Sequence, residues 1–207
     1  SLLNIISGLQ APTTGKIYYK NTDLYKKDQN ELAFFRAREL GIVYQTNYWV
    51  KSLTVLENVS IPLYFMGERT ASAHKKALVA LERVKMAAYA NTYPILLSGG
   101  EQQRIAMARA IVGDPQVIIA DEPTGNLDSS NGDMIISLLQ ELHGSQNKTV
   151  ILVTHNMEYL AIADHLLELH DGVVDEISEL AIPQTVNKML MDTQSRITFL
   201  LKKDTAV

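Results

Sequence analysis

The chain has 207 residues, a length that suits one globular domain or a domain with a subdomain. Lys and Arg number 19 and Asp and Glu number 23, and the resulting net charge of −4 disfavours DNA, RNA or an anionic lipid surface as a partner. The composition, 46% apolar and 20% charged, is typical of a folded protein, and the absence of cysteine excludes disulfides, thiolate metal sites and a cysteine nucleophile. The apolar runs are too short to span a bilayer and no secretory signal opens the chain, so we expect a cytosolic protein.

The N-terminal part of the chain alternates between helical and extended patterns. Apolar residues at helical spacing predict a helix that Gly8 ends, and turn residues separate this helix from a short strand. A charged surface helix and a second strand follow. The predicted elements are a helix over Ser1–Leu9, a strand over Lys16–Tyr19, a helix over Gln29–Leu40 and a strand over Gly41–Tyr44.

The remainder of the chain predicts a helical stretch and then strands that alternate with helices. Val117–Ala120 is an apolar run between breakers and fits a strand buried on both faces. The helix after it is expected to end with Gly144 in the C′ position. Because strands and helices alternate, we expect βαβ units and a mainly parallel sheet. The other predicted elements are helical structure over Val55–Ala90, helices over Glu101–Val112 and Met134–Leu142, and two more buried strands, Thr149–Val153 and Leu166–Leu169.

The segment Leu97–Arg104, with the sequence LSGGEQQR, places a serine and two glycines at the start of a predicted helix. Ser98 can cap this helix and Glu101, three residues later, can cap back, which makes a capping box. Capping does not explain Gly99 and Gly100, because glycine costs roughly 1 kcal/mol in a helix relative to alanine. A helix N-terminus with bare N–H groups is a ready site for an anion. The pattern therefore indicates that an anionic ligand approaches the backbone closely.

Two adjacent carboxylates, Asp121 and Glu122, follow the apolar strand Val117–Ala120. Open α/β sheets bind ligands at the carboxyl ends of their strands, and paired carboxylates after a buried strand are costly without a cation or water to serve. We expect Asp121 to hold Mg²⁺ and Glu122 to activate a water molecule. A solvated acidic loop is the alternative, and the apolar strand in front of the pair disfavours it.

His155 and Gln45 also come directly after predicted strands. A lone histidine at such a position is often only a cap for the next helix, and Gln45 alone carries little information. Two strand ends that bring an acidic pair and His155 to one rim favour a functional role. His165 and His170 lack this placement, so we interpret them as surface residues and expect no metal pair.

These motifs, taken together and in this order, resemble the nucleotide-binding subunits of ABC transporters. The resemblance rests on LSGGEQQR at 97–104, VIIADEPTGNLD at 117–128 and VTH at 153–155, with Gln45 in GIVYQ at the Q-loop position. The ADEPTGNLD wording and the stretch Thr54–Val59 look like the lipoprotein-releasing and macrolide-exporter branch. The resemblance implies an α/β fold, a P-loop NTPase-like, mainly parallel sheet flanked by helices, with an inserted helical subdomain and a remnant of an antiparallel β subdomain.

The resemblance runs from Ser1 to about Glu176 and implies a division of the chain. Residues 1–176 would form an ABC-type nucleotide-binding domain without its N-terminal strands and P-loop, with the helical subdomain at about 50–112. Residues 177–207 would form a C-terminal helical extension. We favour a helix that folds back on the domain over a membrane-surface or partner-docking helix, because its apolar face carries few basic residues.

In this family two such domains pair head to tail and enclose two ATP molecules, and the resemblance assigns roles on that basis. Asp121 would bind Mg²⁺, Glu122 would be the general base, and His155 would orient the attacking water. Gln45 would touch both Mg²⁺ and the water. The implied cofactor-binding residues are Ser98, Gly99, Gly100, Gln102, Asn126 and Asp128, of which the last two belong to the D-loop across the dimer interface.

The sequence departs from the family at its front, where no G-x-x-x-x-G-K-[ST] motif is present. Gly15–Lys16 is the nearest approximation, but Gln10 stands in place of the first glycine and Ile17 in place of Ser or Thr. The family pattern puts Ser1–Asn4 just past the P-loop. We therefore expect the sequence to begin partway into a longer protein, and the 207 residues alone to bind ATP very poorly.

The leading hypothesis is an ATPase that powers a transmembrane permease subunit. It would act as a homodimer or with a paired nucleotide-binding domain, at the cytoplasmic face of a bacterial membrane. We expect no nucleic-acid partner. One alternative is a non-transport ATPase that regulates a membrane-bound cell-envelope complex. Another alternative is a catalytically impaired pseudo-subunit. The intact motifs argue against this hypothesis, and the missing P-loop argues for it. Tyr48 and Trp49 could line the groove for the permease's coupling helix, although ordinary packing explains them almost as well.

Overall fold

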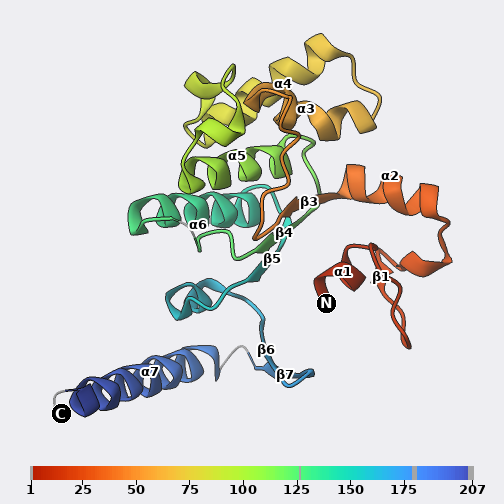
Figure 1. Cartoon of the computed structure of the whole chain (residues 1–207). Coiled ribbons are helices and arrows are strands. Elements are labelled where there is room, and N and C mark those ends of the chain that lie inside the picture. Colours follow the sequence, from red (N-terminus) through yellow and green to blue (C-terminus); the bar gives the residue numbers. More distant parts are fainter. Residues whose placement is uncertain (1, 126, 179–180, 205–207) are drawn as a thin grey trace. The chain divides into compact units, whose positions relative to one another are not determined.

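The computed structural model describes residues 2–125, 127–178 and 181–204, and in the last helix it describes side chains through residue 191 and at 193–194 (Figure 1). The chain divides into two compact units, residues 1–153 and 154–207. The predicted boundary at residues 176–177 lies inside the second unit.

A three-stranded parallel sheet organises the first unit. Its strands, in the order β3-β4-β5, are β3 (Leu40–Val43), β4 (Val117–Asp121) and β5 (Thr149–Val153). Neighbouring parallel strands need crossover connections, and helices supply them along the chain both before and after β4. The predicted α/β class with a mainly parallel sheet is confirmed.

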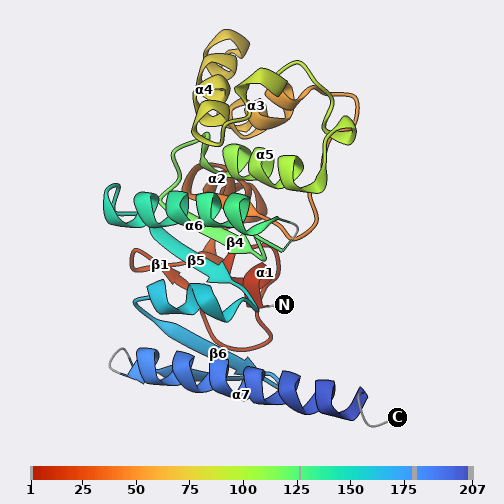
Figure 2. The same cartoon turned by 90° about the vertical axis from the view of Figure 1, so that its left-hand side faces the viewer.

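The helices that connect these strands pack on the sheet and on one another. Helices α3 (Val55–Phe65), α4 (Thr70–Arg83) and α5 (Gly99–Ile111) contact one another, and α5 also contacts β3. Helix α6 (Ser129–Gly144) lies along β5 and beside α5, as both Figure 1 and Figure 2 show. Short 3₁₀ turns, η2 (Ala87–Tyr89) and η3 (Pro94–Leu96), lead from α4 to α5.

Two predicted helix ends differ from the observed ones. The helical stretch predicted over Val55–Ala90 is interrupted after Phe65, where Gly67 adopts a φ of +83° that ends α3. Gly144 is not the C′ residue of α6 but its last helical residue, and Ser145 caps the helix with its N–H on Glu141 O at 3.0 Å. A glycine followed by a serine is compatible with either ending, so the sequence could not distinguish them.

The N-terminal segment packs against β3 and α2 (Gln29–Glu39). Helix α1 (Leu2–Ile6) ends before Gly8, whose φ is +71°, and the hairpin β1 (Tyr18–Tyr19) and β2 (Thr22–Asp23) leads into η1 (Leu24–Lys26). The buried residues of this cluster are Leu24, Leu32, Phe35, Leu40 and Ile119.

The second unit is a hairpin packed on a long helix. Strands β6 (Leu166–His170) and β7 (Val173–Ile177) are antiparallel, and α7 (Ile182–Asp204) contacts η4 (Met157–Ile162). Leu166, Ile182 and Val186 form its buried cluster.

The prediction that the strands over Thr149–Val153 and Leu166–Leu169 are buried is wrong. Leu167 and Leu169 of β6 are exposed, because a two-stranded hairpin can cover only one of its faces. Strand β5 is only half-buried, because it is the last strand in the order of the described sheet. No helix within the described residues is long and apolar enough to cross a membrane.

Candidate functional site

The ends of β3 and β4 place three of the predicted site residues at one edge of the sheet. Val43 pairs with Ala120, so Gln45 and Glu122 each come two residues after this pair. Asp121 is the last residue of β4. Because the strands are parallel, their carboxyl ends lie at the same edge, which we call the acidic rim. Gln45 is exposed on it, and Asp121 and Glu122 are half-buried.

Glu122 has an unusual backbone conformation that nearby hydrogen bonds support. Its φ is +48°, in the left-handed region that residues other than glycine rarely adopt. Its N–H donates to Val153 O at 2.9 Å, and its carbonyl oxygen accepts from Gly125 N–H at 3.2 Å. Strained backbone of this kind collects at functional sites, where the surroundings hold a side chain in one direction. Here the hydrogen bonds with Val153 and Gly125 hold the Glu122 backbone in this conformation.

Asp121 occupies an environment that suits a bound cation. Burial raises the pKa of the Asp121 carboxyl, and the charge of Glu122 raises it further. A desolvated carboxylate beside a second carboxylate lacks positive charge, which Mg²⁺ would supply. The described residues contain no cluster of three or more His, Cys, Asp and Glu side chains fit to hold a metal. A carboxylate oxygen is a ligand that Mg²⁺ accepts where phosphate and water complete its coordination.

Replacement of Asp121 by asparagine is expected to stabilise the metal-free protein. A pKa raised in the folded state means that ionised Asp121 destabilises the fold, so stability at this position increases as the pH falls. Asp121→Asn removes that cost at pH 7–8 and should therefore raise Tm. Differential scanning calorimetry without metal measures the effect.

Asp128 provides the control of opposite sign. It caps α6, and the hydrogen bond from Asn131 N–H, at 2.9 Å, lowers the pKa of the Asp128 carboxyl. A lowered pKa means that its ionised form stabilises the fold, an effect lost as the pH falls. Asp128→Ala should therefore lower Tm at pH 7–8. A decrease for both variants would contradict the electrostatic origin assigned to Asp121.

The N-terminus of α5 is a helix tip with its capping box formed. Ser98 N–H donates to Glu101 Oε2 at 2.9 Å, and Glu101 N–H donates to Ser98 Oγ at 3.3 Å. The capping box predicted from the sequence is confirmed. It leaves the N–H groups of Gly99 and Gly100, which have no acceptor within the helix. Ser98 and Gly99 are exposed, so the tip can receive an anion from outside the chain.

The remaining predicted site residues have mixed placements. Gln102 uses both ends of its amide within the chain: Oε1 accepts from Trp49 Nε1 at 2.8 Å, and Nε2 donates to Leu97 O at 3.0 Å. Asn126 lies outside the described residues. His155 is exposed in the second unit, two residues after the end of β5.

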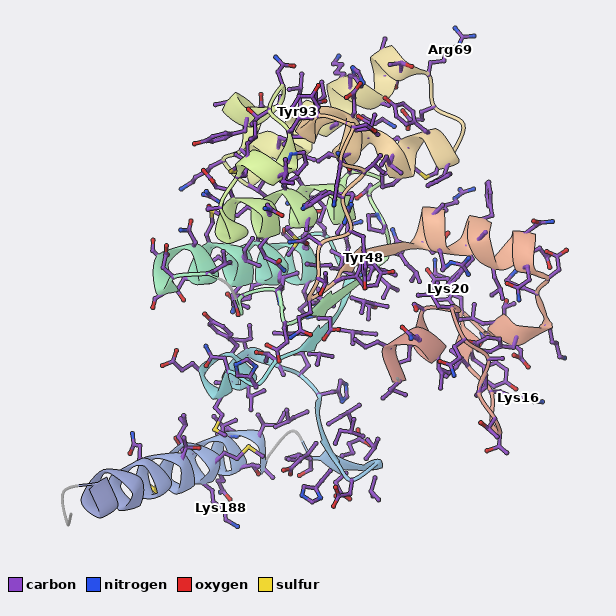
Figure 3. The ribbon with its side chains drawn as sticks, in the orientation of Figure 1. Lys16, Lys20, Tyr48, Arg69, Tyr93 and Lys188 are labelled. Atoms are coloured by element: carbon purple, nitrogen blue, oxygen red, sulfur yellow. The ribbon has the colours of Figure 1, made fainter. Side chains whose placement is uncertain are left out.

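A small pocket of about 190 Å³ lies where the segment after β3 meets α5. Figure 3 labels Tyr48 and Tyr93, which come from the two segments that flank it. Exposed apolar side chains adjoin it, with Tyr48 at 69%, Ile95 at 67% and Leu96 at 72% exposure. The sequence drew attention to Trp49 here but gave no signal for Asn47 or for the engagement of Gln102. The residues that line the pocket are Asn47, Trp49, Lys51, Pro94, Ile95 and Gln102.

Comparison with known proteins gives consistent results. A model of the ABC transporter family matches residues 1–125. The lipoprotein-releasing system ATP-binding protein LolD of Treponema denticola is 38% identical over 177 residues, which cover 86% of this chain and 78% of that protein. The uncharacterized ABC transporter ATP-binding protein MJ1508 of Methanocaldococcus jannaschii is 41% identical over 177 residues, covering 86% of this chain and 79% of that protein.

Comparison with solved structures indicates the same family. The dimeric structure of the ABC transporter cassette MJ0796 has a TM-score of 0.81 and 38% identity, covering 86% of this chain and 79% of that one. A post-hydrolysis state of the same cassette, bound to ADP and Pi, matches with the same TM-score of 0.81. A helix tip suited to an anion, an acidic rim at the strand ends and these relatives all agree. The chain therefore belongs to the ABC transporter family, in which it is an ATP-binding ATPase subunit.

Proposed function

We propose that two copies of this chain, or this chain and a paired nucleotide-binding domain, associate head to tail around Mg²⁺-ATP and drive a transmembrane partner. One observation carries the proposal: the capping box at Ser98 leaves the Gly99 and Gly100 N–H groups without an intrahelical acceptor on an exposed tip. Such a tip suits the γ-phosphate of a nucleotide that the other copy holds. The dimeric state of the similar MJ0796 cassette supports this arrangement.

The rim residues then divide the chemistry of phosphoryl transfer to water. Asp121 would hold Mg²⁺, which when bound neutralises charge on the phosphates. Glu122, whose backbone is fixed by Val153 and Gly125, would accept the proton of the attacking water. Gln45 and His155 would orient that water. Asn126 and Asp128 would lie across the dimer interface, where Asp128 would also keep α6 capped.

Gln102 would support the tip rather than contact nucleotide directly, because both ends of its amide are engaged inside the chain. The proposed nucleotide contacts on the tip are therefore Ser98, Gly99 and Gly100. Positioning and charge neutralisation, the main contributions to phosphoryl transfer, would come from these groups together with the rim.

The pocket beside Trp49 is proposed to receive a side chain of the transmembrane partner. Its volume of about 190 Å³ is below the range of about 300–1,000 Å³ of small-molecule sites, and suits one side chain of a protein. Tyr48, Ile95 and Leu96 offer apolar surface around it. A partner helix seated here would hold the protein peripherally on the cytoplasmic face of the membrane.

Complementation between two inactive variants tests the head-to-tail arrangement in the native polypeptide that carries these residues. Ser98→Arg blocks the tip and Glu122→Gln removes the base, so each variant alone should lose about 100-fold or more of its ATP turnover. In a mixture, half of the dimers contain one copy of each variant and hold one site with an intact tip and an intact rim. About a quarter of the wild-type activity should therefore return.

A mixture as inactive as its components would contradict the shared site. Docking is checked in parallel by sedimentation with membranes, where Ile95→Glu should reduce the bound fraction. The control is Glu82→Gln, an exposed position of α4 that the proposal does not use.

A further inference from the structure

Trp49 is the only tryptophan of the chain, and it lies between the pocket and helix α5. Its indole Nε1–H donates to Gln102 Oε1 at 2.8 Å. The guanidinium carbon of Arg109, three turns along α5 from the tip, lies 4.4 Å from the centroid of the Trp49 ring. A cation over an indole face is the strongest form of this contact. The ring is therefore fixed to α5 both at its edge and across its face.

Gln102 connects this ring to the helix tip. The same amide that accepts from Trp49 donates through Nε2 to Leu97 O at 3.0 Å, and Leu97 directly precedes Ser98. An amide group is planar and rigid, so a shift of the indole that carries Gln102 Oε1 with it also displaces Nε2 and disturbs its bond to Leu97 O. We name this chain of contacts, from Trp49 through Gln102 to the Leu97 carbonyl, the tip relay.

The segment that carries Trp49 is anchored on both sides. Arg109 Nη1 donates to Tyr48 O at 2.8 Å, and the buried Asn58 side chain bonds to Val50 N at 3.0 Å and to Val50 O at 3.1 Å. A displacement of Trp49 is therefore not absorbed by a loose loop on either side, and it passes to α5.

The same segment also contains an imperfectly satisfied polar pair. Asn47 Nδ2 donates to Gln103 Oε1 at 3.1 Å, but among the described side chains Asn47 Oδ1 and Gln103 Nε2 are buried with no partner. Partly satisfied buried groups cost free energy, so this pair contributes little to holding the segment in place, and the bonds of Arg109 and Asn58 remain its anchors.

We propose that Trp49 is a positioning residue that transmits occupancy of the pocket to the nucleotide-contacting tip of α5 through the tip relay. A partner side chain that enters the pocket pushes on the indole, the Gln102 amide tilts, and the Leu97–Ser98 backbone moves relative to the nucleotide. The role in catalysis rests on the proposed function, whereas the mechanical link can be measured without nucleotide.

Hydrogen–deuterium exchange on the 207-residue chain tests the mechanical link. Trp49→Phe keeps an aromatic ring for Arg109 and removes the indole donor together with part of the ring, and Gln102→Met keeps the length and removes the amide. In either variant the capped amides of Ser98, Glu101 and Gln102 should exchange about 2- to 10-fold faster, the range that one hydrogen bond supplies. The double variant should show the same increase as either single one, because both break one relay. The control is Glu82→Gln, an exposed position of α4 that lies outside the relay.

Three outcomes would overturn the relay. Unchanged exchange at the tip would show that Trp49 and Gln102 do not affect the backbone at Ser98. Faster exchange spread over all of α5, with a lowered Tm, shows that Trp49 only packs the core. Increases that add up in the double variant show that the two residues act independently.

Kinetics in the native polypeptide test the catalytic part. Trp49→Phe and Gln102→Met should each lower kcat by about 2- to 10-fold and leave KM for ATP within error. Because partial unfolding also lowers apparent kcat at constant KM, kcat is expressed per folded molecule, with the folded fraction taken from thermal unfolding of the same samples. Normal kcat with faster tip exchange would overturn the positioning role alone. Full turnover of Glu122→Gln in the same assay would overturn the proposed function, whatever the exchange data show.

Discussion

Glu122→Gln is expected to lower ATP turnover by about 10²- to 10⁴-fold, the contribution of a positioned general base, while ATP is still bound. The amide keeps the shape of the side chain but cannot accept a proton at neutral pH. Because the enclosed ATP is then hydrolysed very slowly, the nucleotide-bound dimer should persist. Single-turnover kinetics measure the chemical step, and sedimentation velocity with Mg²⁺-ATP measures the dimer.

The position of Glu122 in the fold means that its substitution tests the chemistry of the side chain. The residue directly follows β4, has a φ of +48°, and its N–H is bonded to Val153 O. Glutamine meets the same backbone restraints, so the substitution changes the chemistry and not the geometry. Glu82→Gln, on the exposed side of α4, is the matched control and should retain wild-type turnover. Loss of dimer together with loss of turnover in Glu122→Gln would assign this residue to the interface instead of to catalysis.

Local signals in the sequence predicted much of the fold and of the site. Ser98 and Glu101 form the capping box because its two hydrogen bonds join residues three apart, within reach of local pattern reasoning. The acidic rim follows from the alternation of strands and helices, since that alternation makes the sheet parallel and gathers its strand ends. The function followed from the resemblance of the motifs at 97–104, 117–128 and 153–155, in that order, to ABC transporter subunits.

The sequence did not predict features that depend on packing between distant segments. Trp49 and Gln102 are 53 positions apart, and no periodicity relates them. The left-handed backbone of Glu122 also has no signal, because glutamate in a motif reveals its charge but not its φ. The exposure of Leu167 and Leu169 depends on which face of a hairpin is covered, and alternation alone leaves this open.

Gly41→Ala is expected to destabilise the first unit severely. Gly41 lies in β3 where α5 crosses it, and a Cβ built there would lie 2.9 Å from Pro115 Cγ, 3.0 Å from Ala110 C, and closer still to Ala110 O. Backbone atoms cannot rotate away as a side chain can, so the helix itself must shift. Overpacking of this kind costs about 3 kcal/mol or more, which should lower Tm by roughly 6–12 °C.

Gly144→Ala separates this steric effect from the general effect of replacing glycine. Gly144 is helical and exposed, and no atom lies within 4 Å of a Cβ built there, so alanine should stabilise the protein by about 0.5–1 kcal/mol. Thermal and urea unfolding of the two variants should therefore move in opposite directions. Equal stability of Gly41→Ala and wild type would mean that α5 is not seated on β3 as observed. Since the C-terminal turn of α5 is held at Gly41 and its N-terminus carries the Ser98 tip, the same shift should also reduce ATP turnover.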